Sequence, residues 1–221
     1  ISPRNILIFQ ETHGERTSYI WKLSDFSLAH IVTRPLGKDG ETGEGSNWSD
    51  DGEPMPDPNR RGERSYLGPE SLYSTPSMTA KSDVWSLGSV ISIVFAYLEG
   101  GSEGVTQYGE TRSQHRAADG YDRFFVRGTV FTPIKVHPVV KSWHTGLIDK
   151  AHQRDPREGD AVELMLRYLE KKVFVAAPAE RDSAMQVEGK LLNTFRRYSN
   201  LAKSPGGTQA RSFLRGLFSQ V

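Results

Sequence analysis

The longest apolar stretch of the chain runs from Val84 to Leu98, and its hydrophobic residues cover nearly every face of a helix. A helix that is hydrophobic all round is buried on all sides. The pair Ser82 and Asp83 precedes the stretch as an N-cap, and Gly100 and Gly101 follow it as a stop. The pattern therefore predicts a buried central helix over about residues 83–98, shorter than the ~20 residues that a membrane span requires.

Two short runs rich in β-forming residues precede this helix. The runs "NILIF" at residues 5–9 and "YIWKL" at residues 19–23 are separated by a polar segment, and together they predict a small hairpin. Residues 34–64 are rich in Gly, Pro and Asp and show neither helical nor strand periodicity. That composition predicts a long loop, which we expect to be the most mobile part of the chain.

After residue 80 the chain is predicted to be mostly helical. Residues 100–120 are loop-like, and a helix is expected to begin near Pro138. The segment "DAVELMLRYLEKKVF" carries Asp160 and Glu163 in a capping-box pattern before an apolar stripe. The segment "DSAMQVEGKLLNTFRRY" repeats this arrangement, with Asp182 as the expected cap.

The charges of the chain are nearly balanced, with 28 Lys and Arg against 27 Asp and Glu and a net charge of +1. This balance provides no general attraction to nucleic acid or to an anionic membrane. The absence of cysteine excludes disulfides, thiolate metal sites and a cysteine nucleophile, and it fits a reducing compartment. We therefore expect an intracellular protein, cytoplasmic or nuclear, with one main domain.

Five short stretches occur in an order that resembles the C-terminal lobe of a protein kinase. "ISPRNIL" resembles the end of the catalytic loop, "LSDFS" the Asp-Phe-Gly metal corner, and "SYLGPE" the Ala-Pro-Glu end of the activation segment. "SDVWSLG" resembles the start of the central helix and "AERDSA" the late arginine motif. The resemblance implies an α+β kinase-like fold without its N-terminal lobe. The lobe would cover residues 1–200, with an activation segment at 25–70 and a C-terminal tail at 201–221.

By this resemblance, Asn5 and Asp25 hold the Mg²⁺ ions that bridge the phosphates of ATP. Mg²⁺ is a hard cation that prefers oxygen ligands, which a carboxylate and an amide supply. The resemblance further implies ATP and Mg²⁺ as cofactors and a protein substrate whose Ser or Thr hydroxyl accepts the phosphoryl group. In the alternative interpretation, Asn5 caps a turn and Asp25 ends a strand.

The implied activation segment contains Asp25, Phe26, Ser27, Glu63, Gly68, Pro69 and Glu70. Several positions depart from the family pattern. Ser27 replaces the glycine of the metal corner and lacks its backbone freedom. Glu63 stands where a threonine is common, and Gly68 replaces an alanine. Ser2 occupies the place of a lysine that stabilises the transferred phosphate in Ser/Thr kinases.

The catalytic Asp that the resemblance implies would precede Asn5 by five residues, which is the position immediately before Ile1. The groups of the N-terminal lobe that cover the phosphates are likewise missing from the chain. Because the chain also begins without Met, we expect it to be a fragment that is inactive by itself. Two functions stay open: a Ser/Thr protein kinase, or a pseudokinase scaffold, which Ser2, Ser27 and Glu63 favour.

Four residues are expected to hold the fold and to perform no chemistry. By the resemblance, Glu70 forms a buried ion pair with Arg181, whose planar guanidinium binds a carboxylate through two nitrogens. Asp83 is expected to cap the central helix and to reach backbone amides of the catalytic loop, with Trp85 packed beside it.

The C-terminal stretch "RSFLRGLFSQV" places four apolar residues on one face of a helix, namely Phe213, Leu214, Leu217 and Phe218. Such a helix either packs on its own domain or docks a partner or a membrane surface. The six histidines show neither the HExxH motif nor a paired i, i+4 spacing, so the sequence does not indicate a zinc enzyme.

Overall fold

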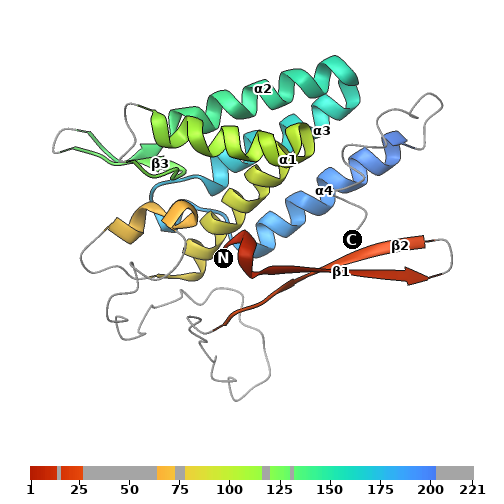
Figure 1. The fold of residues 1–221 in the computed structure, drawn as a ribbon, viewed down its shortest axis with the longest axis horizontal. Coiled ribbons are helices and arrows are strands. Elements are labelled where there is room, and N and C mark those ends of the chain that lie inside the picture. The colour runs from red at the N-terminus through yellow and green to blue at the C-terminus, as the bar shows by residue number, and fades with distance from the viewer. Residues whose placement is uncertain (14–15, 27–63, 73–77, 116–119, 130–131, 203–221) are drawn as a thin grey trace.

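The computed structural model describes residues 1–13, 16–26, 64–72, 78–115, 120–129 and 132–202 (Figure 1). Four expectations concern residues outside these ranges: those for Ser27, for Glu63, for the 34–64 loop up to residue 63 and for the apolar tail at 211–221.

Four helices make up most of the described chain: α1 Ala80–Gln114, α2 Pro138–Arg154, α3 Pro156–Tyr168 and α4 Ala184–Ala202. Five short helical turns also occur in the described ranges. Four are 3-10 turns, η1 Pro3–Asn5, η3 Arg64–Tyr66, η4 Pro69–Leu72 and η6 Pro178–Glu180, and one is a π-helical turn, η5 Leu169–Val173. Two antiparallel sheets of two strands complete the described fold: β1 Ile6–His13 with β2 Arg16–Leu23, and β3 Phe125–Val126 with β4 Lys135–Val136. The predicted α+β class, mostly helical with a small hairpin, is confirmed at this coarse level.

The central helix α1 begins three residues before the predicted start. Thr79, in an extended conformation, accepts a hydrogen bond from the Lys81 amide at 3.2 Å, while the Ser82 hydroxyl accepts one from the Thr79 amide at 3.2 Å. This reciprocal pair is a capping box. The expectation that Asp83 caps the helix is therefore wrong, because Thr79 already satisfies the first turn and the Asp83 side chain is 65% exposed.

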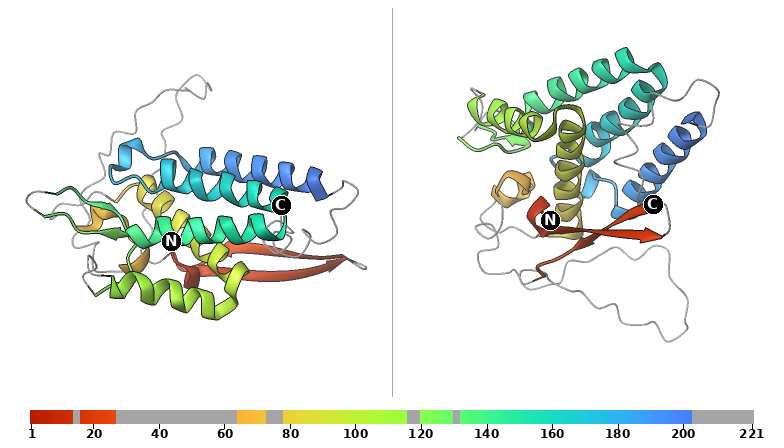
Figure 2. Two further views of the ribbon diagram at one scale, coloured as in Figure 1. Left: turned by 90° about the horizontal axis from the view of Figure 1, so that it is seen from above. Right: turned by 45° about the vertical axis from the view of Figure 1, so that its right-hand side comes forward.

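The glycine pair Gly100 and Gly101, which was expected to end the central helix, instead bends it. Gly101 has φ 59° and ψ −152°, a conformation that glycine adopts far more readily than other residues. The helix then resumes and continues to Gln114, so the loop expected over residues 100–120 is wrong as far as residue 114. Gly104, Tyr108 and Arg112 are buried at intervals of four residues, which shows that one face of this second segment packs on the body. Figure 2 shows the two segments of α1 turned sharply away from each other.

Helices α2 and α3 begin at N-cap residues that the sequence analysis did not identify. The helix expected near Pro138 is confirmed, and His137 caps it by accepting from the Val139 amide. Helix α3 begins at Pro156 behind Asp155, whose carboxylate accepts from the Arg157 amide at 2.8 Å, so the capping box predicted at Asp160 is wrong. Proline suits this first helical position because the amide there needs no helical partner.

Helix α4 is capped by Ser183 rather than by Asp182. The Ser183 hydroxyl accepts from the Gln186 amide at 3.3 Å, and the Gln186 side chain accepts from the Ser183 amide at 2.7 Å. Asp182 instead accepts a hydrogen bond from the Tyr168 hydroxyl at 2.9 Å. Asp182 therefore joins α4 to α3 and is not available as a cap.

The core forms where α1 meets α2, α3, η5 and strand β3. Trp85 is fully buried, with edge-on contacts to Phe125 and Phe174 at ring-centre distances of 6.1 and 5.2 Å. The Phe124 ring stacks on the Phe174 ring, with 5.5 Å between the two ring centres. Among the described residues, α1 is the one helix long and apolar enough to span a membrane by length and composition, but most of that stretch is buried inside the protein.

The predicted hairpin is present and is longer than expected. Its register pairs Ile6 with Leu23 at the open end and His13 with Arg16 at the turn, so the polar residues around the turn also pair. In Figure 1 the hairpin lies along the edge of the molecule opposite α2. Five of its large apolar side chains are between 41% and 58% exposed, namely Leu7, Ile8, Phe9, Trp21 and Leu23. A two-stranded hairpin with exposed apolar residues on both faces is marginally stable by itself and favours a covering partner.

Candidate functional site

The two expected magnesium ligands lie at the open end of the β1–β2 hairpin. Asn5 ends the turn η1 immediately before β1, and Asp25 follows β2 by two residues. The Ser24 amide donates a hydrogen bond to the Asn5 carbonyl at 2.8 Å, which continues the strand register one step beyond Ile6 and Leu23. The structure therefore brings Asn5 and Asp25 to neighbouring strand ends, although they are twenty residues apart in the sequence.

Asp25 has an unusual backbone conformation. Its φ is 58°, and no other non-glycine residue of the described ranges has a positive φ. Aspartate tolerates this left-handed region better than most residues, but it still carries a conformational cost. Such strained positions occur preferentially at functional sites, where the surrounding structure holds them.

The donor set at the hairpin end suits a magnesium ion shared with phosphates. Mg²⁺ keeps several waters and is commonly bound by only one or two protein side chains together with phosphate oxygens. Asn5 and Asp25 offer one amide and one carboxylate. No group of three or more His, Asp or Glu side chains that could enclose a metal ion occurs among the described residues. Two protein ligands by themselves would leave most coordination positions of a Mg²⁺ ion to water or to phosphate oxygens.

Two further residues of the kinase resemblance, Phe26 and Asp83, have exposed side chains. Phe26 follows Asp25 directly and its side chain is 65% exposed. The Asp83 carboxylate lies 3.5 Å from the amino nitrogen of Ile1, at the start of the stretch that leads to Asn5. This contact is with the amino group of Ile1 and not with a backbone amide, so the expected bonds from Asp83 to backbone amides of this stretch stay a prediction.

The expected ion pair between Glu70 and Arg181 is present and fully buried. Arg181 Nη1 donates to Glu70 Oε1 at 2.8 Å, and Nη2 donates to Oε2 at 2.7 Å. The same guanidinium also donates to the carbonyls of Val175, Ala176 and Lys81. Burial by itself raises the pKa of the Glu70 carboxyl, but the hydrogen bonds and charge of Arg181 outweigh burial and hold that pKa below its usual range.

Trp85 and Gly68 shape the two sides of this ion pair. The Arg181 guanidinium lies 4.9 Å from the ring centre of Trp85, so Trp85 packs under Arg181 in the core and not beside the exposed Asp83. A Cβ at position 68 would lie 2.5 Å from both carboxylate oxygens of Glu70, so glycine leaves the space that this carboxylate occupies. Pro69 is buried in the first turn of η4, which carries Glu70.

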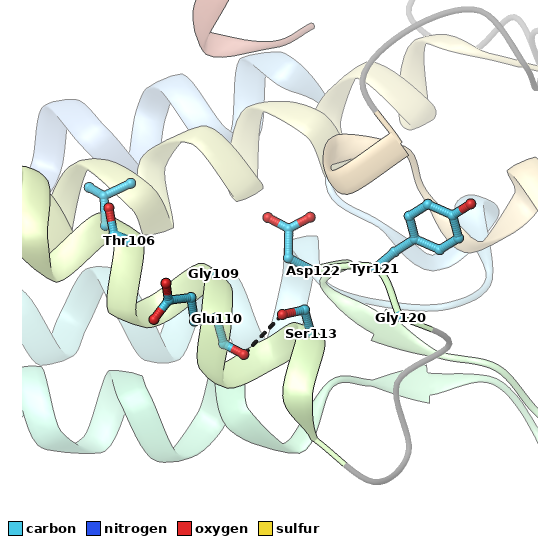
Figure 3. Close-up of a pocket in the computed structure, with 8 residues that line it drawn as sticks. Thr106, Gly109, Glu110, Ser113, Gly120, Tyr121 and Asp122 are labelled. Atoms are coloured by element: carbon cyan, nitrogen blue, oxygen red, sulfur yellow. Dashed lines mark hydrogen bonds between the residues drawn. The ribbon is translucent and has the colours of Figure 1, made fainter.

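A shallow hollow lies between the second segment of α1 and residues 120–122 (Figure 3). Its lining includes Thr106, Glu110 and Ser113 from the helix, with Tyr121 and Asp122 opposite. Turn η3 is bonded to two of these residues: Ser65 donates to Asp122, and Arg64 donates to the Tyr121 hydroxyl at 2.6 Å. The sequence carries no motif for this hollow, since its walls come from a segment that looks like a loop.

Comparison with protein-family models, with curated proteins and with solved structures gives no match for this chain. The likeness to a kinase lobe therefore rests on the five sequence stretches.

Proposed function

We propose that this chain is the helical lobe of a protein kinase-like domain, in which Asn5 and Asp25 bind the magnesium of ATP. The observation that carries this proposal is the position of Asn5 and Asp25 at neighbouring strand ends of one hairpin, with Asp25 in a left-handed conformation. The buried Glu70–Arg181 pair supports it further, because it joins the end of the implied activation segment to the helical body.

The roles of the chain's own residues follow from their chemistry. The Asp25 carboxylate and the Asn5 amide oxygen supply hard ligands, and a bound Mg²⁺ would neutralise phosphate charge. The exposed apolar residues of the hairpin provide a surface beside those ligands for a nucleotide base or for a covering lobe. Phosphoryl transfer also requires a base and a phosphate cover, which these residues do not provide.

Magnesium-dependent nucleotide binding tests this proposal directly. Titration of the purified chain with a fluorescent ATP analogue should show weak binding that requires Mg²⁺. Asp25→Asn should abolish it, because the amide keeps the tolerance for a left-handed backbone but removes the charge. Asp149→Asn, at an exposed site on α2, is the matched control and should bind as the parent does. Binding that survives Asp25→Asn, or that is independent of Mg²⁺, would contradict the proposal.

The second function is a pseudokinase scaffold, favoured by Ser2 at the position of the phosphate-stabilising lysine. Both functions predict that the 221-residue chain transfers no phosphate to a protein. A longer chain with an Asp immediately before Ile1 separates them. Transfer of labelled phosphate by that chain would support the enzyme, and inactivity together with binding of a protein partner would support the scaffold.

A further inference from the structure

A chain of hydrogen bonds runs through the helical core and joins both segments of α1 to α2 and to η5. The hydroxyls of Tyr108 and Ser92, which lie on opposite sides of the Gly101 bend, are 3.0 Å apart. Ser92 Oγ lies 2.8 Å from His144 Nε2, and His144 Nδ1 lies 3.0 Å from Glu170 Oε1. Tyr108, Ser92 and His144 are fully buried, so water does not compete for these bonds.

The chemistry of the groups sets the direction of each hydrogen bond. Arg167 donates from Nη1 to both oxygens of Glu170, at 3.2 and 3.1 Å, and the ionised carboxylate can only accept. His144 must therefore carry its hydrogen on Nδ1, and the neutral ring accepts at Nε2 from the Ser92 hydroxyl. The Ser92 oxygen in turn accepts from the Tyr108 hydroxyl. A proton added at Nε2 would remove the acceptor of the Ser92 hydroxyl, so one of the two buried hydroxyl hydrogens, on Ser92 or on Tyr108, would have no acceptor within this chain of four groups.

The second segment of α1 is attached to the first through a bend that only glycine adopts easily. Gly101 has φ 59° there, and a Cβ at Gly100 or Gly101 would meet no atom within 4 Å, so the bend is surrounded by open space. Beyond it, Tyr108 and Arg112 anchor the segment. The Arg112 guanidinium lies 4.0 Å from the Tyr108 ring centre, and its Nε donates to the Asp122 carbonyl at 2.9 Å.

We propose that the Tyr108–Ser92–His144–Glu170 chain is an acid-sensitive latch, which holds the second segment of α1 on the body and releases it to swing about Gly101 when His144 gains a proton. This inference does not depend on the proposed phosphoryl transfer. Its consequence is a change in the hollow of Figure 3, because Thr106 and Glu110 on one wall would move with the segment and Asp122 on the other wall would not.

Burial and the charged and titratable groups around His144 together favour its neutral form in the latched state. Burial lowers the pKa of His144; hydrogen bonding to Glu170 opposes the shift, and the charges of Arg167 and Arg112 add to it. Burial raises the pKa of Glu170, but the hydrogen bonds from His144 and Arg167 outweigh burial and lower it overall. Burial also raises the pKa of the Tyr108 hydroxyl, which keeps its proton. A ring with a lowered pKa in the latched state stabilises that state above pH ~6.5, and the latch weakens as the pH falls below that value.

Hydrogen–deuterium exchange of the whole chain, read peptide by peptide, tests the latch. Protection of amides 102–114, corrected for intrinsic exchange, should fall by about tenfold between pH 7.5 and pH 5. Amides of α3 should keep their protection. In His144→Gln the protection of 102–114 should be the same at both pH values, because the amide fills the site without titrating. The nearly isosteric Tyr108→Phe should lower protection of 102–114 already at pH 7.5 and remove most of its acid response.

Two comparisons make the result specific to His144. His137→Asn removes a buried histidine that contacts the His115 ring and should leave the acid response of 102–114 in place, as should His152→Gln at a half-exposed site. An acid response that persists in both His144→Gln and Tyr108→Phe would overturn the proposal. Equal loss of protection in α3 and in 102–114 would also overturn it, because it would indicate global unfolding rather than release of one segment.

Discussion

Arg181 holds Glu70 through two parallel hydrogen bonds of 2.7 and 2.8 Å, and both side chains are almost completely buried. The two residues are 111 positions apart, so the pair joins turn η4 to the segment that precedes α4. Three further hydrogen bonds to backbone carbonyls use the remaining donors of Arg181, so the buried guanidinium is fully partnered.

Removing one member of this pair should destabilise the protein strongly. Arg181→Met leaves Glu70 charged in the core, and breaking a buried pair in this way costs about 3–5 kcal/mol of the free energy of unfolding. Urea unfolding followed by circular dichroism measures the change. Arg157→Ala, at an exposed position on α3, is the control and should change stability by less than about 0.5 kcal/mol. Equal effects of Arg181→Met and Arg157→Ala would contradict the pair's structural role.

The cap of α1 can be assigned by comparing Thr79 with Asp83. Thr79→Ala removes the acceptor for the Lys81 amide and should lower stability by about 1 kcal/mol. Asp83→Asn changes an exposed side chain and should lower it by only about 0.3 kcal/mol, through the helix dipole. The midpoints of thermal unfolding rank the two variants. A larger loss for Asp83→Asn would reinstate Asp83 as the main support of this helix end.

The bend in α1 makes two neighbouring glycines respond in opposite ways. Gly101→Ala forces a side chain into the left-handed region and should cost about 1–2 kcal/mol. Gly100→Ala has an ordinary φ and open space for its methyl group, so it should stabilise the helix by about 0.5–1 kcal/mol. Chemical unfolding of the two variants provides the comparison. If both substitutions stabilised the protein, α1 would be straight at this point.

Acid should destabilise the protein partly through His137. This side chain is buried and accepts from the Val139 amide through Nδ1, and burial together with the charges of His115 and Arg112 lowers its pKa to about 4. The unfolded ring titrates near pH ~6.5, so the neutral folded ring contributes stability that is present above pH ~6.5 and is lost as the pH falls toward about 4.

His137→Asn should flatten this part of the pH profile by at most roughly 3 kcal/mol, because asparagine keeps the cap and does not titrate. Urea unfolding at pH 7.5 and at pH 4.5 measures the difference between variant and parent. His152→Gln, at a half-exposed site, should follow the parent profile. Parallel profiles for the parent and His137→Asn would show that His137 does not contribute to acid sensitivity.

The sequence by itself determined the features that depend on local pattern. Two β-rich runs close in sequence formed the hairpin, and a continuous apolar run became the central helix, because strand pairing and helix burial follow the spacing of apolar residues. The ion pair of Glu70 and Arg181 and the closeness of Asn5 and Asp25 were also expected, but from the resemblance to a kinase lobe and not from spacing. The structure confirms the ion pair, whereas magnesium binding by Asn5 and Asp25 stays a prediction.

Tertiary structure alone decided the features that depend on distant partners. Residues 102–114 read as a loop because they are rich in glycine and polar residues, yet Tyr108 and Arg112 turn them into a helix by packing against Phe124 and Trp143. The latch likewise unites Ser92, His144 and Glu170 from three elements, and no spacing in the sequence relates them. The caps at Thr79, Asp155 and Ser183 were missed because several Ser, Thr and Asp residues stand near each helix start. Only the backbone conformation selects the one whose oxygen reaches a free amide.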